Sequence, residues 1–463
     1  MLKIKDRIAW SARTKTVKRL ISRAEGMRVS SELELMEMQR RSFNIVWKDA
    51  VDNLPFYKMW MEQHNLPCSI NCISDLQGWP ILKKPFLVQS QEMLVRKNAA
   101  LSRKSVTGGA TGEPLHFRTF PSQVLDVSVN KWLGWQSAGF DPDDRCFLIW
   151  GHRHFYGSGM GSDLRFALQR FKDWLVNNRR ASAIDLSSTH LARMIDELIT
   201  YRPKVIIAYS ASLLAACRHN LHRRDEVQRL GVSSVVCTAG PLTMSERTEI
   251  GQYFGANVSM EYGSMEAGVI AYMTDQERGY RVFRDTHIVH THRNPIGNHH
   301  CLVTTLTHNY LPLIRYDIGD YVHDPRESCG SVEGFSEVSG RDSDQVVLDD
   351  GTAFHGYAFM VCAESIPNIL AYQLHVQSSA IEFRVRTRVP LSGQERIEMN
   401  KKIIDLVPRL ASINLTILNT DDLLTAPSGK IPLVIYGAGL GSQEVLTNSS
   451  VQSRPSNNPM PNS

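Results

Sequence analysis

The sequence has no long apolar run, and this absence excludes whole classes of protein. Its 463 residues contain no apolar window of membrane-spanning length, and the start lacks the apolar segment that a signal peptide requires. We therefore expect a cytoplasmic protein without a transmembrane segment. The apolar fraction of 42% and the charged fraction of 21% are typical of a globular protein, and the length suffices for two or three domains.

Cysteines are few, and their spacing matches no disulfide framework. The eight cysteines form no CxxC pair, and several lie inside apolar runs, as Cys146 does within residues 145–150. This usage is typical of reduced, mostly buried thiols. A zinc site at His299, His300 and Cys301 is the weaker interpretation, because no second pair of ligands stands nearby at zinc spacing.

Basic residues only slightly outnumber acidic residues in this sequence. The formal net charge is +5, and we expect no nucleic-acid partner. Residues 1–28 hold nine Lys or Arg against two acidic residues, with apolar residues at helical spacing. Such a basic amphipathic helix either docks on the protein by its apolar stripe, which is the commoner case, or makes a weak contact with an anionic membrane surface.

The standard nucleotide-binding fingerprints are also missing. The small-residue stretch 105–116 has neither the Lys-Ser/Thr ending of a Walker loop nor GxGxxG spacing, and the similar letters at 436–442 have no helix after them. Because Gly108, Gly109 and Gly112 have no Cβ atom and their neighbours are small, the backbone N–H groups of this stretch can turn inward around a phosphate chain. A glycine-rich surface turn explains the same residues equally well.

Apolar runs and amphipathic stretches alternate through the middle of the chain. Strand-like apolar runs occupy residues 145–150, 204–208, 234–238 and 257–261. Helical patterns lie near residues 121–137, 187–200, 210–222 and 243–253. A lead-in of short helices precedes them over residues 29–84, with Ser74 as a helix cap. The alternation predicts crossover units and a largely parallel sheet, with ligands beyond the carboxyl ends of its strands.

Two of these strand ends carry residues that suit a nucleotide. The run 234–238 continues into Ala239-Gly240-Pro241, and Thr243 is placed to cap the next helix. The run 257–261 leads into a glycine turn with a ring, a hydroxyl and a carboxylate, contributed by Tyr262, Gly263, Ser264 and Glu266. This set suits a planar base with an attached anion and a metal ion. A polar connection with one solvated Glu explains the same residues.

The pattern changes in the last third of the chain. β-rich segments cover residues 279–291, 301–306 and 312–320, a composition shift follows at 340–344, and a sharp turn is expected at 349–351. We therefore expect an α/β fold in which residues 1–339 form a large α/β domain with largely parallel sheets plus a β-rich segment. Residues 340–441 would form a small, mobile α+β domain, and the Ser-, Asn- and Pro-rich residues 442–463 a disordered tail.

Five short motifs stand in an order that marks a family resemblance. They are Thr107-Gly108-Gly109-Ala110-Thr111-Gly112-Glu113-Pro114, Tyr262-Gly263-Ser264-Met265-Glu266, Arg315-Tyr316-Asp317-Ile318-Gly319-Asp320, Gly340-Arg341 and Ser428-Gly429-Lys430. In this order they resemble the adenylate-forming enzymes. Residues 55–57, 80–84 and 311–316 resemble in particular the phenylacetate-coenzyme A ligase branch and its capsular-polysaccharide relatives of the CapK type. The resemblance spans about residues 40–435.

The resemblance implies a role for each motif in a nucleotide site. The β- and γ-phosphates of ATP would be held by Thr107, Gly108, Gly109, Thr111 and Gly112. Gly240 and Tyr262 would line the adenine, with Gly263 in the same turn, while Ser264 would contact the α-phosphate and Glu266 would bind Mg²⁺. Asp320 would hold the ribose hydroxyls, helped by Arg341. Lys430 would reach from the small domain to the α-phosphate and the substrate carboxylate, and would withdraw when that domain rotates about residues 340–344.

The resemblance implies an ATP-dependent, AMP-forming ligase that joins an aryl or other small carboxylic acid to the thiol of coenzyme A. It also implies a homodimer, since homodimers are common in the branch. It departs from the family where Gly108 and Ala110 replace frequent hydroxyl residues and where Ser343 replaces a frequent hinge Asp, and it has no recognisable coenzyme A motif. Three other interpretations stay open. They are transfer to an amine or sugar in surface-polysaccharide biosynthesis, a catalytically degenerate scaffold, and a membrane-surface binding protein.

Overall fold

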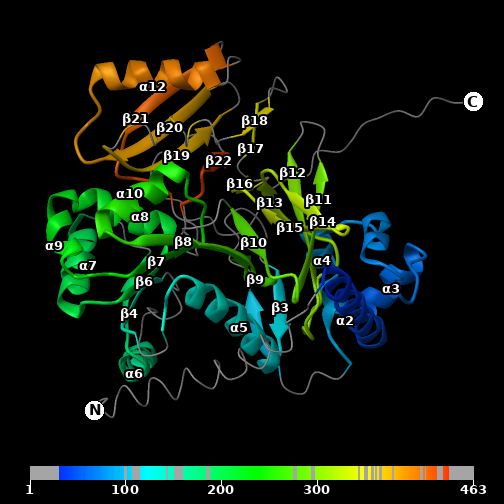
Figure 1. Cartoon of the computed structure of the whole chain (residues 1–463). Helices are drawn as coiled ribbons and strands as arrows, with labels where there is room; N and C mark the ends of the chain where they lie inside the picture. Colours follow the sequence, from blue (N-terminus) through cyan, green and yellow to red (C-terminus); the bar gives the residue numbers. More distant parts are fainter. Residues whose placement is uncertain are drawn as a thin grey trace, which may run out of the picture.

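The computed structural model describes most of the chain between residues 31 and 436 (Figure 1). The segments outside the description are 1–30, 98–101, 107–114, 142–143, 151–159, 184–187, 275–278, 294–297, 342–344, 349–352, 356–358, 360–361, 364–365, 367, 378–379, 407–409, 412, 425–430 and 437–463. The predictions for residues 1–28, the glycine loop, Lys430 and the tail therefore lie outside the described residues.

The lead-in begins with two helices. α2 (Glu32–Asn53) starts after Ser31, whose hydroxyl accepts the backbone N–H of Glu34 at 3.3 Å, and α3 (Pro55–Gln63) starts with a proline, which has no N–H to satisfy. Short elements follow: η1 (Ile73–Gly78), β1 (Leu82–Lys83), α4 (Lys84–Gln89) and η2 (Gln91–Leu94). The predicted Ser74 cap is wrong. Ser74 lies inside η1, whose N-cap is Cys72, and Asp75 Oδ2 accepts the backbone N–H groups of Asn71 and Cys72.

Five parallel strands form the centre of the large sheet. In spatial order they are β8 (Asn257–Ser264), β7 (Ser234–Thr238), β6 (Val205–Tyr209), β4 (Cys146–Trp150) and β5 (Asn178–Ser182). Most of β4, β6 and β7 is buried, as expected for strands covered on both faces. The four predicted strands are confirmed as β4, β6, β7 and β8, and β5 was not predicted.

Helices cover both faces of this sheet. α8 (Ser210–His219) and α10 (Met244–Phe254) lie on one face, and α5 (Pro121–Ser137) lies on the other (Figure 1). Along β4, Phe147 therefore joins the core beneath α8 and α10, whereas Leu148 joins the core beneath α5. Thr243 caps α10 and exchanges hydrogen bonds with Glu246, which confirms the predicted cap. The remaining helices here are α6 (Met160–Leu175), α7 (Ser188–Tyr201), η4 (Leu221–Arg223) and α9 (Arg224–Gln228).

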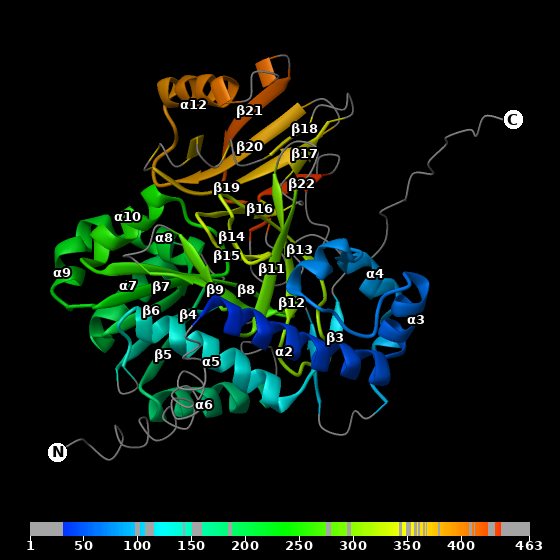
Figure 2. The same cartoon turned by 45° about the vertical axis from the view of Figure 1, so that its right-hand side comes forward.

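Antiparallel strands extend the large sheet beyond β8. They follow in the order β9 (Gly268–Met273), β10 (Tyr280–Val282), β15 (Ser331–Phe335) and β14 (Arg326–Ser328). A second sheet contains β1, β13 (Tyr316–Val322), β12 (His299–Thr305) and β11 (His287–Arg293), with β16 (Val338–Arg341) paired to β13 (Figure 2). β2 (Arg103–Val106) and β3 (His116–Thr119) form a separate hairpin. The buried Tyr57 hydroxyl donates to the Pro312 carbonyl and so fastens the lead-in to this β-rich part.

The C-terminal part has its own hydrophobic cluster, with members between Val346 and Val434. β17 (Gln345–Val347) and β18 (Ala353–His355) pair antiparallel on either side of the predicted turn at 349–351. A four-stranded sheet contains β21 (Asn414–Asn419), β20 (Ala380–Thr387), β19 (Ile369–Val376) and β22 (Val434–Tyr436), and α12 (Gly393–Leu406) adds Met399 and Ile403 to the cluster. This separate core supports the predicted small domain, whose boundaries and mobility stay predictions.

The mixed α/β architecture with a largely parallel sheet and a β-rich part confirms the predicted fold class. Among the residues that the structure describes, no helix combines the length and apolar character needed to cross a membrane.

Candidate active site

The turn between β8 and β9 is the centre of the candidate site. A Cβ atom on Gly263 would lie 2.1 Å from the Gly268 carbonyl oxygen, so only glycine fits where the two strands approach. Gly268 has a φ of 80°, which also favours glycine. Within the turn the Ser264 hydroxyl oxygen accepts the backbone N–H of Ala267 at 3.1 Å. That bond uses the oxygen as acceptor, so the Ser264 hydroxyl proton is left to donate to a ligand.

Tyr262 and Asp320 meet as the resemblance implied. The Tyr262 hydroxyl donates to Asp320 Oδ2 at 3.0 Å, although the two residues are 58 positions apart in the chain. Burial, with Asp320 alongside, raises the pKa of Tyr262 well above its ordinary value, so the phenol stays a proton donor. The Tyr262 ring is held edge-on by Phe335, with ring centres 5.7 Å apart. An aromatic ring beside a buried carboxylate suits a nucleoside base and its ribose hydroxyls.

Glu266 is held by a residue to which the sequence assigned no role. The Tyr316 hydroxyl donates to Glu266 Oε1 at 3.1 Å, and the Glu266 residue is 9% exposed. A hydrogen bond of this kind fixes the direction of a carboxylate before it binds a metal ion. The available signal was the Tyr316 phenol within an apolar strand, because a buried phenol hydroxyl usually has a partner.

A buried network supports the turn from the other side. His287 Nε2 donates to the Ala267 carbonyl at 3.0 Å, and His287 Nδ1 lies 3.0 Å from Thr286 Oγ1. Asn130 on α5 donates to both Thr286 Oγ1, at 2.9 Å, and the Val269 carbonyl, at 3.0 Å. Sequence reasoning missed these residues because nothing local shows that α5 and β11 meet at this turn.

Gly240 follows β7, the strand next to β8. The Ser210 hydroxyl at the start of α8 lies 2.8 Å from the Gly240 carbonyl, which ties the loop to that helix. The preceding Ala239 has a φ of 66°, a conformation that costs a non-glycine residue energy and is found often at functional sites. The backbone therefore places Gly240 at the carboxyl edge of the sheet, where the resemblance expects the adenine.

The remaining predicted site residues are only partly described. Arg341 pairs with Asp320 in the backbone register of β16 and β13, and its side chain lies outside the description. The phosphate-loop residues lie outside it too, between β2 and β3, and they are Thr107, Gly108, Gly109, Thr111 and Gly112. Lys430 also lies outside it.

The described residues contain no preformed metal cluster of three or more His, Cys, Asp or Glu side chains. Burial raises the pKa of the Cys301 thiol to about 12, so this side chain is a neutral thiol beside Tyr262 and not a thiolate ligand. Mg²⁺ is commonly bound by one or two carboxylates together with phosphate oxygens and water. Glu266 therefore fits a Mg²⁺ ion that arrives with a nucleotide.

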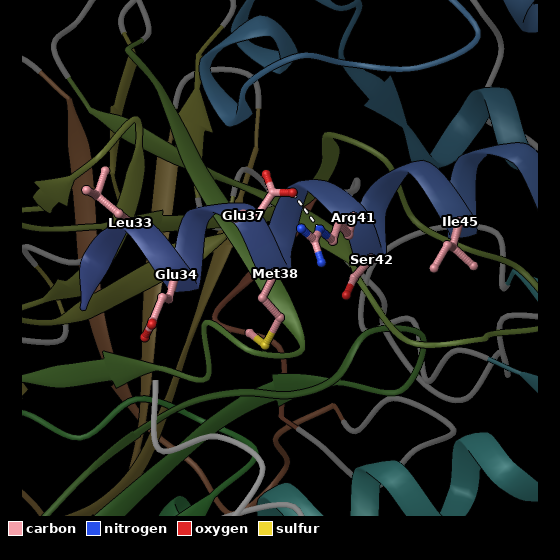
Figure 3. Close-up of a pocket in the computed structure, with 7 residues that line it drawn as sticks. All are labelled: Leu33, Glu34, Glu37, Met38, Arg41, Ser42 and Ile45. Atoms are coloured by element: carbon pink, nitrogen blue, oxygen red, sulfur yellow. Dashed lines mark hydrogen bonds and ion pairs between the residues drawn. The ribbon is translucent and has the colours of Figure 1, made fainter. Parts of the chain in front are cut away.

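A large surface hollow lies elsewhere, along α2 (Figure 3). It measures about 520 Å³, and all of its lining residues belong to that helix. Its apolar ends, Leu33 and Ile45, are 75% and 71% exposed, and Glu37 pairs with Arg41 between them. It contains none of the predicted site residues and no converging set of buried polar groups, so we do not assign the active site to it.

Comparisons with known proteins agree with the motifs. No protein-family model matches the chain. Phenylacetate-coenzyme A ligase of Escherichia coli (strain K12) is 24% identical over 348 residues, which cover 68% of this chain and 73% of that protein. Protein CapK of Staphylococcus aureus is 22% identical over 301 residues, covering 62% of this chain and 63% of CapK. The crystal structure of 2-hydroxyisobutyryl-CoA ligase with R3-HIB-AMP has a TM-score of 0.66 at 15% identity, covering 89% of this chain and 90% of that one.

The fold, the order of the motifs and these relatives agree with one another: the chain resembles the adenylate-forming superfamily. The curated relatives that it matches are phenylacetate-coenzyme A ligases and CapK, the same branch that the motifs resemble.

Proposed function

We propose that this protein activates a small-molecule carboxylic acid with ATP and transfers the acyl group to the thiol of coenzyme A. Its relatives include two phenylacetate-coenzyme A ligases, and its fold matches 2-hydroxyisobutyryl-CoA ligase. At identities of 24% and 20% these relatives support the reaction class, while the acid is proposed only as an organic acid, aryl acids included.

The convergence at the β8–β9 turn is the observation that carries the proposal. Tyr262 and Glu266 come from the turn and its strand, whereas Asp320 and Tyr316 come from β13. Each pair joins a phenol hydroxyl to a buried carboxylate, at 3.0 and 3.1 Å. A folded core needs no such pair of carboxylates at a sheet edge, since burying charge costs free energy. A nucleotide with its metal ion uses both.

In the first step, an oxygen of the acid carboxylate would attack the α-phosphorus of ATP while the bond to pyrophosphate breaks. Both reactants are anions, so the site must direct cations and N–H or O–H dipoles at the charge that builds up. Ser264 would donate its hydroxyl proton to the α-phosphate, and Asp320 would accept from the ribose hydroxyls. In the second step, the thiolate sulfur would attack the acyl carbon, and AMP would leave with the electron pair of the broken bond.

Four further groups have proposed roles in the same steps. Mg²⁺, held by Glu266, would neutralise charge on the phosphate oxygens. The glycine loop would bind the β- and γ-phosphates through backbone N–H groups. Lys430 would place its ammonium between the α-phosphate and the substrate carboxylate, with Arg341 beside Asp320. The predicted homodimer and the predicted contact of residues 1–28 with a membrane stay predictions.

Exchange of labelled pyrophosphate into ATP tests the adenylation step without any acceptor. We expect exchange with one acid from a panel of aryl, fatty and amino acids. Asp320→Asn should raise the ATP concentration for half-maximal exchange about tenfold, as loss of a charged hydrogen-bond acceptor does. Asp317→Asn, which changes another carboxylate of β13, is the matched control and should leave that concentration unchanged. Silence across the panel, with ATP binding confirmed separately, would favour a degenerate scaffold.

A second acceptor is supported by the similarity to CapK. Under this alternative the same acyl-adenylate is attacked by an amine or a sugar amino group in surface-polysaccharide biosynthesis. The two are separated by supplying coenzyme A to the enzyme with the acid that supports exchange. A new thioester with release of AMP supports the thiol acceptor, and continued exchange without a thioester supports the other acceptor.

A further inference from the structure

A second polar pocket lies outside the nucleotide site and has no role in the proposed reaction. It measures about 300 Å³, which is the lower end of the range for small-molecule sites. Five parts of the chain form it. η1 contributes Gln77, β11 contributes His290 to His292, and Arg315 directly precedes β13. β14 contributes Glu327, and β15 contributes Ser331 and Val332.

Three buried side chains that line the pocket lack hydrogen-bond partners at key atoms. His290 is 4% exposed, Arg315 6% and Ser331 2%. Nε of Arg315 and Oγ of Ser331 have no partner among the described residues, and neither ring nitrogen of His290 makes a well-formed hydrogen bond there, although the Gly330 backbone carbonyl lies close enough to favour the protonated ring. More than about 90% of buried polar groups in proteins do have a partner. Three such groups around one pocket therefore indicate that something outside the described residues completes their bonds.

Arg315 is held firmly in place on its other side. Its Nη1 donates to the Leu76 carbonyl at 2.6 Å and to the Gln77 carbonyl, both at the end of η1. The residue has a φ of 46°, a left-handed conformation that costs a non-glycine residue energy. With Nη1 bound and the backbone fixed, Nε is a preorganised donor.

The charge of the lining favours an anion over a cation. Arg315 carries a permanent positive charge, whereas Glu327, the acidic residue of the lining, is exposed at the rim. A metal ion is not supported, because no three metal-ligating side chains converge among the described residues. A guanidinium N–H, an imidazole N–H and a hydroxyl are three donors, and an oxyanion has acceptor sites for all of them.

We propose that this pocket, built from His290, Arg315 and Ser331, binds a small oxyanion, either a carboxylate or a phosphate. The site goes beyond the proposed ligase reaction and does not depend on it. Arg315 directly precedes Tyr316, whose hydroxyl holds Glu266, so neighbouring residues connect the pocket to the nucleotide site.

Anion binding here should take up a proton. In the free protein, burial and the nearby Arg315 charge lower the pKa of His290 to about 4, so its ring is neutral at pH 7. An anion against the ring favours the protonated form and raises that pKa. The anion therefore binds more tightly as the pH falls toward the raised pKa. The other charged or titratable groups of the lining are Arg315, which opposes protonation of His290, and His292 and Glu327, which are exposed.

The test is an NMR titration of the full chain with nitrogen-labelled histidine. His290 is assigned by the signal that disappears in His290→Gln, and acetate and inorganic phosphate are titrated separately from about pH 4 to 7.5, a range that includes the lowered pKa of His290. We expect saturable binding with a dissociation constant of about 1 mM or tighter. The pKa of His290 should rise by about one unit or more. The tighter of the two anions identifies the class of ligand.

His375 is an internal control, because burial also lowers its pKa, and its Nε2 is bonded to Gln373 in the C-terminal part. Its signal should not respond to either anion. Ser331→Ala should weaken binding about tenfold, provided its melting temperature without anion matches the parent. The proposal is overturned if His290 titrates at the same pH with and without anion, if His375 shifts equally, or if Ser331→Ala binds like the parent.

Discussion

Replacing Tyr316 by Phe isolates the contact that orients the proposed metal ligand. The change removes one hydroxyl and keeps the buried ring, so the packing of β13 is retained. The lost bond is from a phenol to a carboxylate that is only 9% exposed, so water screens it little. A hydrogen bond to a charged group contributes about 1.5–3 kcal/mol, and removing a residue that orients a metal ligand weakens metal binding about 10- to 100-fold.

We therefore predict that Tyr316→Phe raises the Mg²⁺ concentration for half-maximal pyrophosphate exchange at least about tenfold. The maximal rate at saturating Mg²⁺ should recover, because Glu266 itself is unchanged. The assay is pyrophosphate exchange with Mg²⁺ varied at a fixed, saturating concentration of free ATP.

Tyr253→Phe is the matched control. The Tyr253 hydroxyl also makes one bond of 3.1 Å, to the Asn220 carbonyl, and its ring is equally buried on α10. This variant should lose about 1 kcal/mol of stability and keep the parental Mg²⁺ dependence. The reasoning is refuted if Tyr316→Phe has the parental Mg²⁺ dependence, or if both variants shift it equally.

Three further predictions concern the wider machinery. Glu266→Gln should raise the Mg²⁺ requirement of exchange, and an unchanged requirement would remove Glu266 as the ligand. Lys430→Ala should abolish exchange while ATP binding, measured by calorimetry, is largely kept; exchange at the parental rate would show that the role of Lys430 is wrong. Arg218→Gln should lower the urea-measured free energy of unfolding by about 1.5–3 kcal/mol, because the buried Arg218 bonds both Glu249 and the Ile369 carbonyl of β19. A loss below about 0.5 kcal/mol would contradict this.

Much of the large sheet was predictable because its strands are short apolar runs between helical patterns. The run 234–238 became β7 with the predicted bounds, and Thr243 capped the next helix because its spacing to Glu246 is a local signal. The Ser74 cap failed for a related reason. The capping pattern here is centred on Cys72, the N-cap of η1, and Asp75 at the third helical position bonds back to the Cys72 N–H, so Ser74 falls inside the helix.

The order of the motifs named the members of the candidate site, whose roles stay predictions, but it named few of their contacts. The order of the motifs placed Tyr262 and Asp320 in one nucleotide site, and the structure joins them by a hydrogen bond. The roles of Tyr316 and His287 depend on which strands of two different sheets face each other, and no local pattern contains that information. The pocket at His290 is a still harder case, since its lining is spread from residue 77 to residue 332.

The central claim is that the carboxylate of the acid substrate attacks the α-phosphorus of ATP, and following an oxygen atom of that carboxylate into the products tests it most directly. The acid that supports pyrophosphate exchange is prepared with heavy oxygen in its carboxylate and turned over with ATP and the acceptor. Attack on the α-phosphorus predicts that one labelled oxygen appears in AMP and none in inorganic phosphate. Label in inorganic phosphate, with ADP as the nucleotide product, would mean attack on the γ-phosphorus and would contradict the account.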